Sequence, residues 1–252
     1  MKLVPTTVLV ALGLTAAAQA QTPAKPAGSA IRICVDQAHG EMALPPQFAA
    51  QYGALATKIG AELVTLDAPT TAAALKDCRA LLFRLPSQEI KQDEREAIVD
   101  FVKKGGSLLL AFDEERRASL ETTRVNEVIA PFGLKLTADT EYLHNTGAIV
   151  KKGTISAADR ELPFSGGRAV EGGTAFGWQL DKDGKPAQVY AASTTVGKTG
   201  KVVVLSDAMA TLFLGTAEGV RHTGVPRDPS RTTFWGKDSV IFMEELLTWL
   251  IK

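Results

Sequence analysis

The chain has 252 residues, of which 45% are hydrophobic and 22% charged, and its 28 basic residues balance 28 acidic ones. These are ordinary globular values, which exclude collagen-like, coiled-coil and wholly disordered chains. The lack of a basic excess argues against a nucleic-acid-binding protein, and two cysteines are too few for a disulfide-dense scaffold or a four-cysteine zinc site.

The N-terminus has the pattern of a secretory signal peptide. Lys2 supplies the positive charge, residues 3–18 are mostly apolar, and Ala18-Gln19-Ala20 fits the small-x-small cleavage rule. The alternative is a retained membrane anchor, but the apolar run is shorter than the roughly 20 residues that a spanning helix needs. We therefore expect a signal peptide over 1–20, a flexible leader over 21–30, and a periplasmic or secreted protein that is not inserted in the membrane after cleavage.

Beyond residue 30, apolar strands alternate with helical segments. Strands are expected at 31–36, 62–66, 79–85 and 107–112, and helices at 46–60, at 72–76 and from an N-cap at Ser87 to about 104. Alternation of this kind predicts an α/β domain built on a doubly wound, mainly parallel sheet.

The middle of the chain has a different pattern. Residues 137–192 contain many glycines and short β-like pieces at 147–150, 174–179 and 188–191, which predict a β-rich insertion. A further buried strand is expected at 201–206 and a last helix from Asp238 or Ser239 onward. We treat 31–252 as one domain that carries this insertion.

The two cysteines follow from the same strand assignment. Cys34 lies in the first strand and Cys78 just before the third. If these strands are parallel neighbours that start level, the two residues lie roughly 13 Å apart along the sheet. That is beyond the roughly 7 Å limit for a disulfide, so two buried thiols are favoured and a disulfide is the alternative.

Polar residues follow the ends of several predicted strands. The group consists of Asp36, His39, Arg84, Asp113 and Asp207. Ligands of open α/β sheets bind beyond the carboxyl ends of the strands, so these residues are the candidate ligand-binding set. No catalytic residue is assigned, and no metal or cofactor is expected.

Each candidate also has a structural interpretation. Asp36 can cap a helix or fix a turn, and its pairing with His39 is too small for a metal site, which needs three or more ligands. Arg84, in an apolar strand, either forms an internal salt bridge to Asp36 or Asp113 or binds a ligand.

Further polar and aromatic residues have no assigned position. The segment 221–231 holds three arginines and His222 and is either a lid over an anionic group or a solvated loop. Trp178 and Trp235 are either sugar-stacking platforms or part of the core. Tyr142, His144 and Asn145 form one more such cluster.

Several motifs together carry a resemblance to a known family. They are Asp-x-x-His-Gly at 36–40, Pro-Ser-x-Glu at 86–89, Phe-Val-x-x-Gly-Gly-Ser-Leu-Leu-Leu at 101–110, Gly-Lys-Val-Val-Val-Leu-Ser-Asp at 200–207 and Leu-Leu-x-Trp-Leu at 246–250. The chain resembles the class I glutamine amidotransferase-like domains of the gliding-motility and intraflagellar-transport (GIFT) type, and in particular exported bacterial members of unassigned function. The resemblance implies a flavodoxin-like sheet and a role in binding or assembly, with carbohydrate as one ligand class.

The sequence also lacks the motifs of several enzyme classes. No Gly-x-Gly-x-x-Gly, Walker or Gly-x-Ser-x-Gly motif is present, and the strand end that would carry an amidotransferase cysteine has Phe112-Asp113 instead. The first hypothesis is therefore a non-catalytic protein that binds a polar small molecule, a carbohydrate or a protein partner at the strand ends. The alternative is a glycan or ester hydrolase that uses His39 with Asp36 or Asp207.

Overall fold

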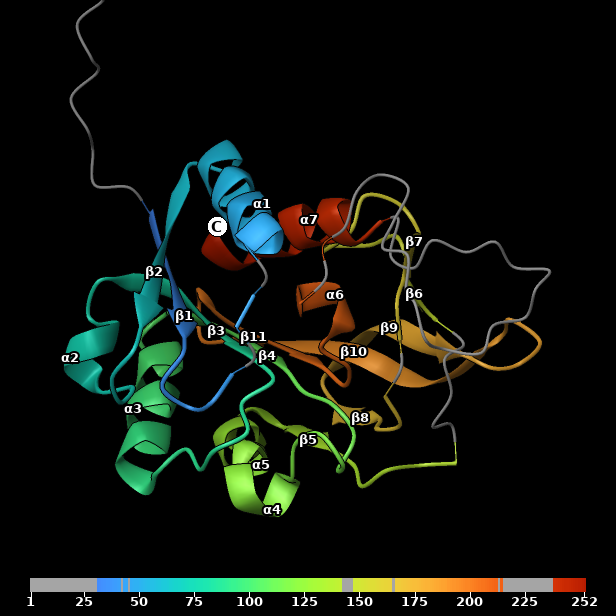
Figure 1. The fold of residues 1–252 in the computed structure, drawn as a ribbon, viewed down its shortest axis with the longest axis horizontal. Coiled ribbons are helices and arrows are strands. Elements are labelled where there is room, and N and C mark those ends of the chain that lie inside the picture. The colour runs from blue at the N-terminus through green and yellow to red at the C-terminus, as the bar shows by residue number, and fades with distance from the viewer. Residues whose placement is uncertain are drawn as a thin grey trace, which may run out of the picture.

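The computed structural model describes residues 31–41, 43–44, 46–141, 147–164, 166–212, 214 and 238–252. These residues form a nine-stranded sheet, a separate two-stranded sheet, and helices on both faces of the large sheet (Figure 1). The predicted mixed α/β class is confirmed. Among the described residues, no helix has the length and apolar character that crossing a bilayer requires.

The strands are, in chain order, β1 (Ile31–Asp36), β2 (Ala61–Leu66), β3 (Cys78–Arg84), β4 (Ser107–Ala111), β5 (Leu134–Leu136), β6 (Ala148–Val150), β7 (Arg160–Leu162), β8 (Val170–Gly172), β9 (Thr174–Leu180), β10 (Pro186–Val196) and β11 (Gly200–Leu205). The α-helices are α1 (Pro46–Lys58), α2 (Ala72–Leu75), α3 (Gln92–Lys103), α4 (Leu120–Thr123), α5 (Val125–Ile129), α6 (Met209–Leu212) and α7 (Ser239–Ile251).

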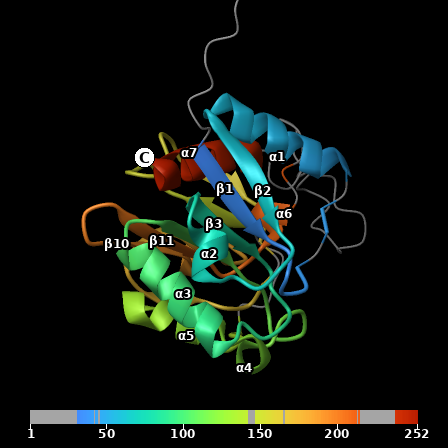
Figure 2. The same cartoon turned by 90° about the vertical axis from the view of Figure 1, so that its left-hand side faces the viewer.

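The large sheet has the strand order β2-β1-β3-β4-β11-β10-β9-β6-β7. The first five strands of this order pair in parallel, and the remaining four join in antiparallel pairs. Helices α1 and α7 lie on one face, and α2, α3 and α5 lie on the other (Figures 1 and 2). The parallel strands therefore all end at the same edge of the sheet.

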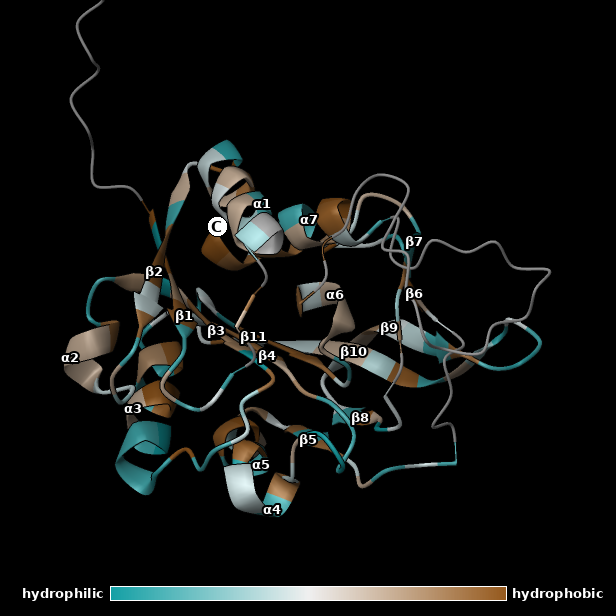
Figure 3. Ribbon diagram, viewed as in Figure 1, coloured by the Kyte–Doolittle hydropathy of each residue, from teal (hydrophilic) through white to brown (hydrophobic). Residues whose placement is uncertain are grey.

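The centre of the sheet is formed by β4 and β11, whose side chains are buried along their length. Leu108–Leu110 on one strand lie beside Val202–Val204 on the other, each at 0–1% exposure. Strands covered by helices on both faces must be apolar on both faces, and this explains the continuous hydrophobic runs (Figure 3).

The predicted β-rich insertion is continuous with the large sheet. Its longest strands, β9 and β10, pair with each other, and β10 also pairs with β11. Strands β6 and β7 extend the same sheet, whereas β5 and β8 form the two-stranded sheet. The segment therefore contributes the antiparallel half of the large sheet.

The predicted helix start at Ser87 is wrong. Helix α3 begins at Gln92, and its N-cap is Lys91, whose backbone N–H donates to the Glu94 carboxylate at 3.1 Å. Ser87 instead donates its hydroxyl to the carbonyl of Gly40 at 2.9 Å. The Ser87 side chain therefore holds the loop after β1, a long-range contact that a local capping pattern does not show.

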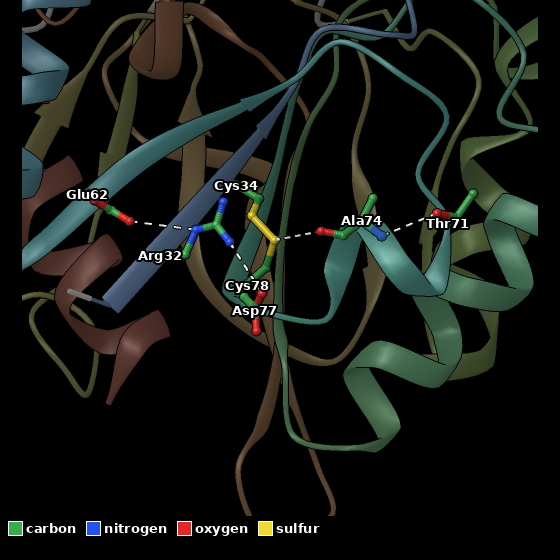
Figure 4. Close-up of a disulfide and its surroundings, with 7 residues drawn as sticks. All are labelled: Arg32, Cys34, Glu62, Thr71, Ala74, Asp77 and Cys78. Carbon is green, nitrogen blue, oxygen red and sulfur yellow. Dashed lines mark hydrogen bonds and ion pairs between the residues drawn. A yellow bond between two sulfur atoms is a disulfide. The ribbon is translucent and has the colours of Figure 1, made fainter. Parts of the chain in front are cut away.

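The favoured interpretation of two buried thiols is also wrong, because Cys34 and Cys78 form a disulfide (Figure 4). Cys78 lies beside Arg32, only two residues from Cys34, and the pairing of β1 with β3 shifts register at this point. Strands that start level would place the two residues four positions apart, and β1 and β3 do not start level. The observed pairing, with its offset and its shift, places the two Cα atoms 5.7 Å apart, within the usual range for a disulfide.

Removing this disulfide should destabilise the protein by about 2–4 kcal/mol, because the bond closes a long loop in the unfolded chain. The test is urea unfolding of a Cys34→Ser/Cys78→Ser variant under conditions in which the wild-type protein is oxidised. An intact mass two hydrogens below that of the reduced chain verifies the bond in the wild-type protein. An unchanged unfolding midpoint would contradict the prediction.

Candidate functional site

The ends of four neighbouring parallel strands place four of the predicted site residues at one edge. Asp36 ends β1, Arg84 ends β3, and Asp113 and Asp207 lie two residues beyond β4 and β11. Ala111 pairs with Leu205, so Asp113 and Asp207 continue level with each other. All four residues are buried, at 0–5% exposure. We call this edge the strand-end rim.

The first contact group at the rim surrounds His39. Its Nδ1 lies 2.9 Å from Asp36 Oδ1, and its Nε2 lies 3.2 Å from the Glu94 carboxylate. Its backbone N–H donates to the second oxygen of Asp36 at 3.1 Å, and its ring packs edge-on against Phe83. Both ring nitrogens are thus engaged by carboxylates.

The charges around His39 favour its protonated form. Burial lowers the pKa of His39, but the hydrogen bonds and charges of Asp36 and Glu94 outweigh this effect and raise that pKa above 6.5. Thr70 connects the two acids, since its hydroxyl donates to Asp36 at 3.3 Å and its backbone N–H donates to Glu94 at 2.7 Å. This group has the properties of a structural clamp that joins the loop after β1 to α3.

The second contact group contains Arg84. Its Cζ lies over the Tyr52 ring, 5.5 Å from the ring centre, and its Nε lies 3.6 Å from Glu41 Oε2. Glu41 also accepts a hydrogen bond from the Arg84 backbone N–H. Burial raises the pKa of Glu41 well above its usual range. The charge of Arg84 opposes this shift, and the like charge of Asp36 adds to it. Tyr52 donates its hydroxyl to the carbonyl of Thr211.

The third contact group is the pair Asp113 and Asp207. Asp113 accepts a hydrogen bond from the backbone of Glu114 at 2.9 Å, and Asp207 accepts one from the backbone of Met209 at 2.7 Å. Arg117 lies 3.4 Å from Asp113 and 2.9 Å from the Glu114 carboxylate. Burial, reinforced by the charge of Asp207, raises the pKa of Asp113 to about 10, so Asp113 carries a proton at neutral pH.

A glycine segment covers this acid pair. A Cβ at Gly166 would lie 3.2 Å from Asp113 Oδ1 and 3.3 Å from Asp207 Oδ2, so only glycine fits without displacement. Arg168 holds the segment in place from a fully buried position. It donates to the carbonyls of Asp113 at 2.6 Å and Thr137 at 2.8 Å and pairs with Glu115.

The rim also gathers buried polar atoms that have no hydrogen-bond partner within the described chain. They are Glu41 Oε2, Arg84 Nε, Asp113 Oδ2, Glu114 Oε2, the Tyr190 hydroxyl and the Ser206 hydroxyl. Burial and the charges of Asp207 and Asp113 raise the pKa of Tyr190, so its hydroxyl remains a neutral donor next to the acid pair. Native proteins leave few such atoms unpaired, so these atoms call for partners other than the residues that the structure describes.

The predicted site residues therefore share one edge but divide into three contact groups. Sequence reasoning missed Glu41, Tyr52, Glu94, Tyr190 and Gly166. Glu94 carried a signal, because it lies on the same buried helix face as Ile98 and Val102. A carboxylate on an apolar face requires a partner.

Other candidates lie elsewhere. Trp178 is half-buried in β9, and residues 142, 144, 145, 221–231 and 235 lie outside the described residues.

No group of three metal-ligating side chains occurs in the described parts of the chain. A cavity of about 580 Å³ lies at the opposite edge of the sheet, lined in part by Cys78, Phe101 and Thr199.

No family model and no curated protein matches the chain. Among solved structures, the N-terminal domain of mmIFT52 has a TM-score of 0.57 at 16% identity, over 71% of this chain and 87% of that one. A ThuA-like protein from Bacteroides uniformis has a TM-score of 0.49 at 10% identity, over 91% of this chain and 95% of that one. A GMP synthase-type protein from Thermoplasma acidophilum has a TM-score of 0.48 at 8% identity, over 87% and 94%. The likeness to the mmIFT52 domain shows a shared fold.

Proposed function

We propose that the chain is an exported, non-catalytic protein that binds a polar ligand at the strand-end rim. The observation that carries the proposal is the group of buried polar atoms that lack partners there within the described residues. A polar small molecule or a carbohydrate would complete their hydrogen bonds. A protein partner held at the same edge is the other form of this binding or assembly function.

The arrangement of the strands supports a GIFT-type amidotransferase-like assignment. The order β2-β1-β3-β4-β11 is that of flavodoxin-like sheets, in which ligands lie near the point where the first and third strands diverge. Asp36 and Arg84 end these two strands. The fold shared with the mmIFT52 N-terminal domain supports the same assignment.

The surroundings of His39 favour binding over hydrolysis. A general base needs a free ring nitrogen directed at a nucleophile or water, whereas both nitrogens of His39 meet carboxylates. The end of β4 offers Asp113, which burial keeps protonated, in the place of an amidotransferase cysteine. A hydrolase based on His39 with Asp36 or Asp207 would have to break the clamp first.

The disulfide supports export to the periplasm or beyond. Stable disulfides form in oxidising compartments, and the pattern of residues 1–20 points to the same destination. The described residues begin at Ile31, so the signal and the leader rest on the sequence alone.

The test is native mass spectrometry of the full-length chain expressed in a bacterium and purified from its periplasm. We expect cleavage before Gln21 and a co-purified polar small molecule in the wild-type protein. Tyr190→Phe and Ser206→Ala should each reduce ligand occupancy about tenfold, because each removes a hydrogen bond to the ligand. Neither variant should lower the stability of the ligand-free protein, since these hydroxyls have no partner in the described chain.

The matched control is Ser239→Ala. Ser239 also has a buried hydroxyl without a partner in the described residues, but it lies at the start of α7. Its variant should keep the ligand. A bare protein mass in every preparation would contradict the small-molecule form of the proposal, and turnover abolished by His39→Ala in a folded protein would contradict its non-catalytic part.

A further inference from the structure

Arg84 differs from the other buried and half-buried arginines of the chain. Arg168 donates to several backbone carbonyls and Glu115, Arg160 binds Glu245 through two nitrogens, and Arg79 donates to the carbonyls of Ile251 and Gly105. The guanidinium of Arg84, in a residue with 5% exposure, forms no hydrogen bond with any residue that the structure describes. A guanidinium has five N–H donors, and leaving the buried Nε donor without an acceptor is costly.

Glu41 does not satisfy this cation. Its Oε2 is 3.6 Å from Arg84 Nε, which is longer than a hydrogen bond, and both atoms lack hydrogen-bond partners within the described residues. Its other oxygen accepts from the Arg84 backbone. Burial also favours the neutral acid, since it raises the pKa of Glu41. The guanidinium therefore lacks a close, charged acceptor.

The surroundings hold the guanidinium in a fixed orientation. The Arg84 Cζ lies over the Tyr52 ring, 5.5 Å from its centre, and the Tyr52 hydroxyl donates to the carbonyl of Thr211. A cation–π contact of this kind does not use the N–H groups of the guanidinium as hydrogen-bond donors to a carboxylate or phosphate. The next residue, Leu85, has a φ of 68°, a conformation that a leucine rarely adopts. Strain of this kind at the end of β3 is typical of functional positions.

We propose that Arg84 is an oxyanion receptor, which binds a carboxylate or phosphate group of the polar ligand at the strand-end rim. The inference rests on the proposed function and adds the chemical class of the ligand. Carboxylate and phosphate oxygens match the planar fork of a guanidinium and accept two parallel hydrogen bonds from it. Glu41 then lies beside the bound anion, and in its neutral form it donates a hydrogen bond to it.

The test is titration calorimetry of the ligand-free, full-length processed protein with sodium acetate and with inorganic phosphate. We expect saturable binding of at least one of the two anions, and the anion with the higher affinity identifies the group on the ligand. Arg84→Gln should weaken this binding by about tenfold or more, and Arg84→Lys should retain part of it, because lysine keeps the charge but not the fork. Glu41→Gln should retain binding, because the glutamine amide can donate to the anion as the neutral acid does.

The matched control is Arg116→Gln. The Arg116 side chain is 79% exposed, and its Nη2 pairs with Glu114 at 3.0 Å. Its loss should leave anion binding unchanged. If Arg84→Gln does not fold, Arg84→Lys and the wild-type anion titration still decide the question.

Two outcomes overturn the inference. The first is no saturable binding of either anion, and the second is binding that Arg84→Lys and Arg84→Gln leave unchanged. If Arg84 and Glu41 only form an internal ion pair, Glu41→Gln should lower the stability of the protein, and acetate and phosphate should not bind. If a ligand co-purifies and depends on Tyr190 and Ser206 but neither anion competes with it, this inference fails and the proposed function stands. A bare protein mass together with anion binding at Arg84 would mean that the small-molecule form of the proposed function fails and that this inference stands.

Discussion

Asp113→Asn should stabilise the protein at pH 8 by about 2–4 kcal/mol. Asp113 and Asp207 are fully buried and border the same glycine, so both cannot be ionised at low cost. Asparagine has the shape of the protonated acid. It can still accept from the backbone of Glu114, and its amide can donate where the protonated acid does. The variant therefore keeps the hydrogen bonds and removes the cost of taking up a proton.

The pH dependence follows from the direction of the shift. The folded protein raises the pKa of Asp113 from 3.8 to about 10, so it binds a proton that the unfolded chain releases. The free energy of unfolding of the wild-type protein consequently falls as the pH rises between these values. The gain from Asp113→Asn should be near zero at pH 4 and should grow toward pH 8. Urea unfolding at pH 4.5, 6 and 8 measures it.

The control for this prediction is Asp67→Asn. Asp67 is exposed and forms no ion pair within the described residues, so its variant should leave the pH profile unchanged. The competing effect is the ion pair of Asp113 with Arg117, at 3.4 Å. A loss of stability in Asp113→Asn at pH 8 would mean that Asp113 is ionised and that this ion pair dominates.

The parallel strands and the strand-end rim could be predicted because the burial of the strands leaves a visible pattern in the sequence. Strands covered on both faces, such as 107–110 and 202–204, appear as continuous apolar runs. The polar residue after each run, such as Asp113 or Asp207, marks the end of the strand. Because parallel strands end at the same edge, these local signals also located the candidate site.

The partners of those residues could not be predicted in the same way. Glu94 meets His39 from a helix that begins more than fifty residues later, and Tyr190 reaches the rim from an antiparallel strand. Their positions depend on how α3 and β10 pack, which local periodicity does not encode. The predicted distance between the two cysteines was wrong for a related reason. The pairing of β1 with β3 shifts register at Arg32, so the distance is not that of a regular sheet. Sequence patterns indicate where each strand ends, whereas the contacts of each side chain depend on the tertiary packing.

His39→Gln should destabilise the protein by about 3 kcal/mol near pH 6, because it leaves two buried carboxylates without their shared cation. Asp36 and Glu94 are held 2.9 Å and 3.2 Å from the ring nitrogens, and neither can turn to water. Glutamine can donate to one acid but not to both. Urea unfolding at pH 6 and pH 9 provides the measurement, with Glu94→Gln as the partner variant.

The sign of the pH effect distinguishes this clamp from a catalytic base. The folded state raises the pKa of His39 above 6.5, so its stabilising contribution is complete below that pH and is lost as the pH rises through the folded value. The folded state lowers the pKa of Glu94 below 4.5, so the contribution of Glu94 is lost only in stronger acid. The cost of His39→Gln should therefore be largest near pH 6 and smaller at pH 9.

Titration of His39 by NMR gives the deciding observation. We expect a pKa above 6.5 in the wild-type protein and a lower pKa in Glu94→Gln, because that variant removes one of the two charges that hold the proton. A pKa below 6.5 in the wild-type protein, or His39→Gln of unchanged stability, would contradict the clamp and return His39 to the candidates for a general base. A base must release its proton readily at working pH, whereas two buried carboxylates bind that proton more tightly. The geometry that stabilises the loop after β1 is thus the geometry that opposes catalysis by His39.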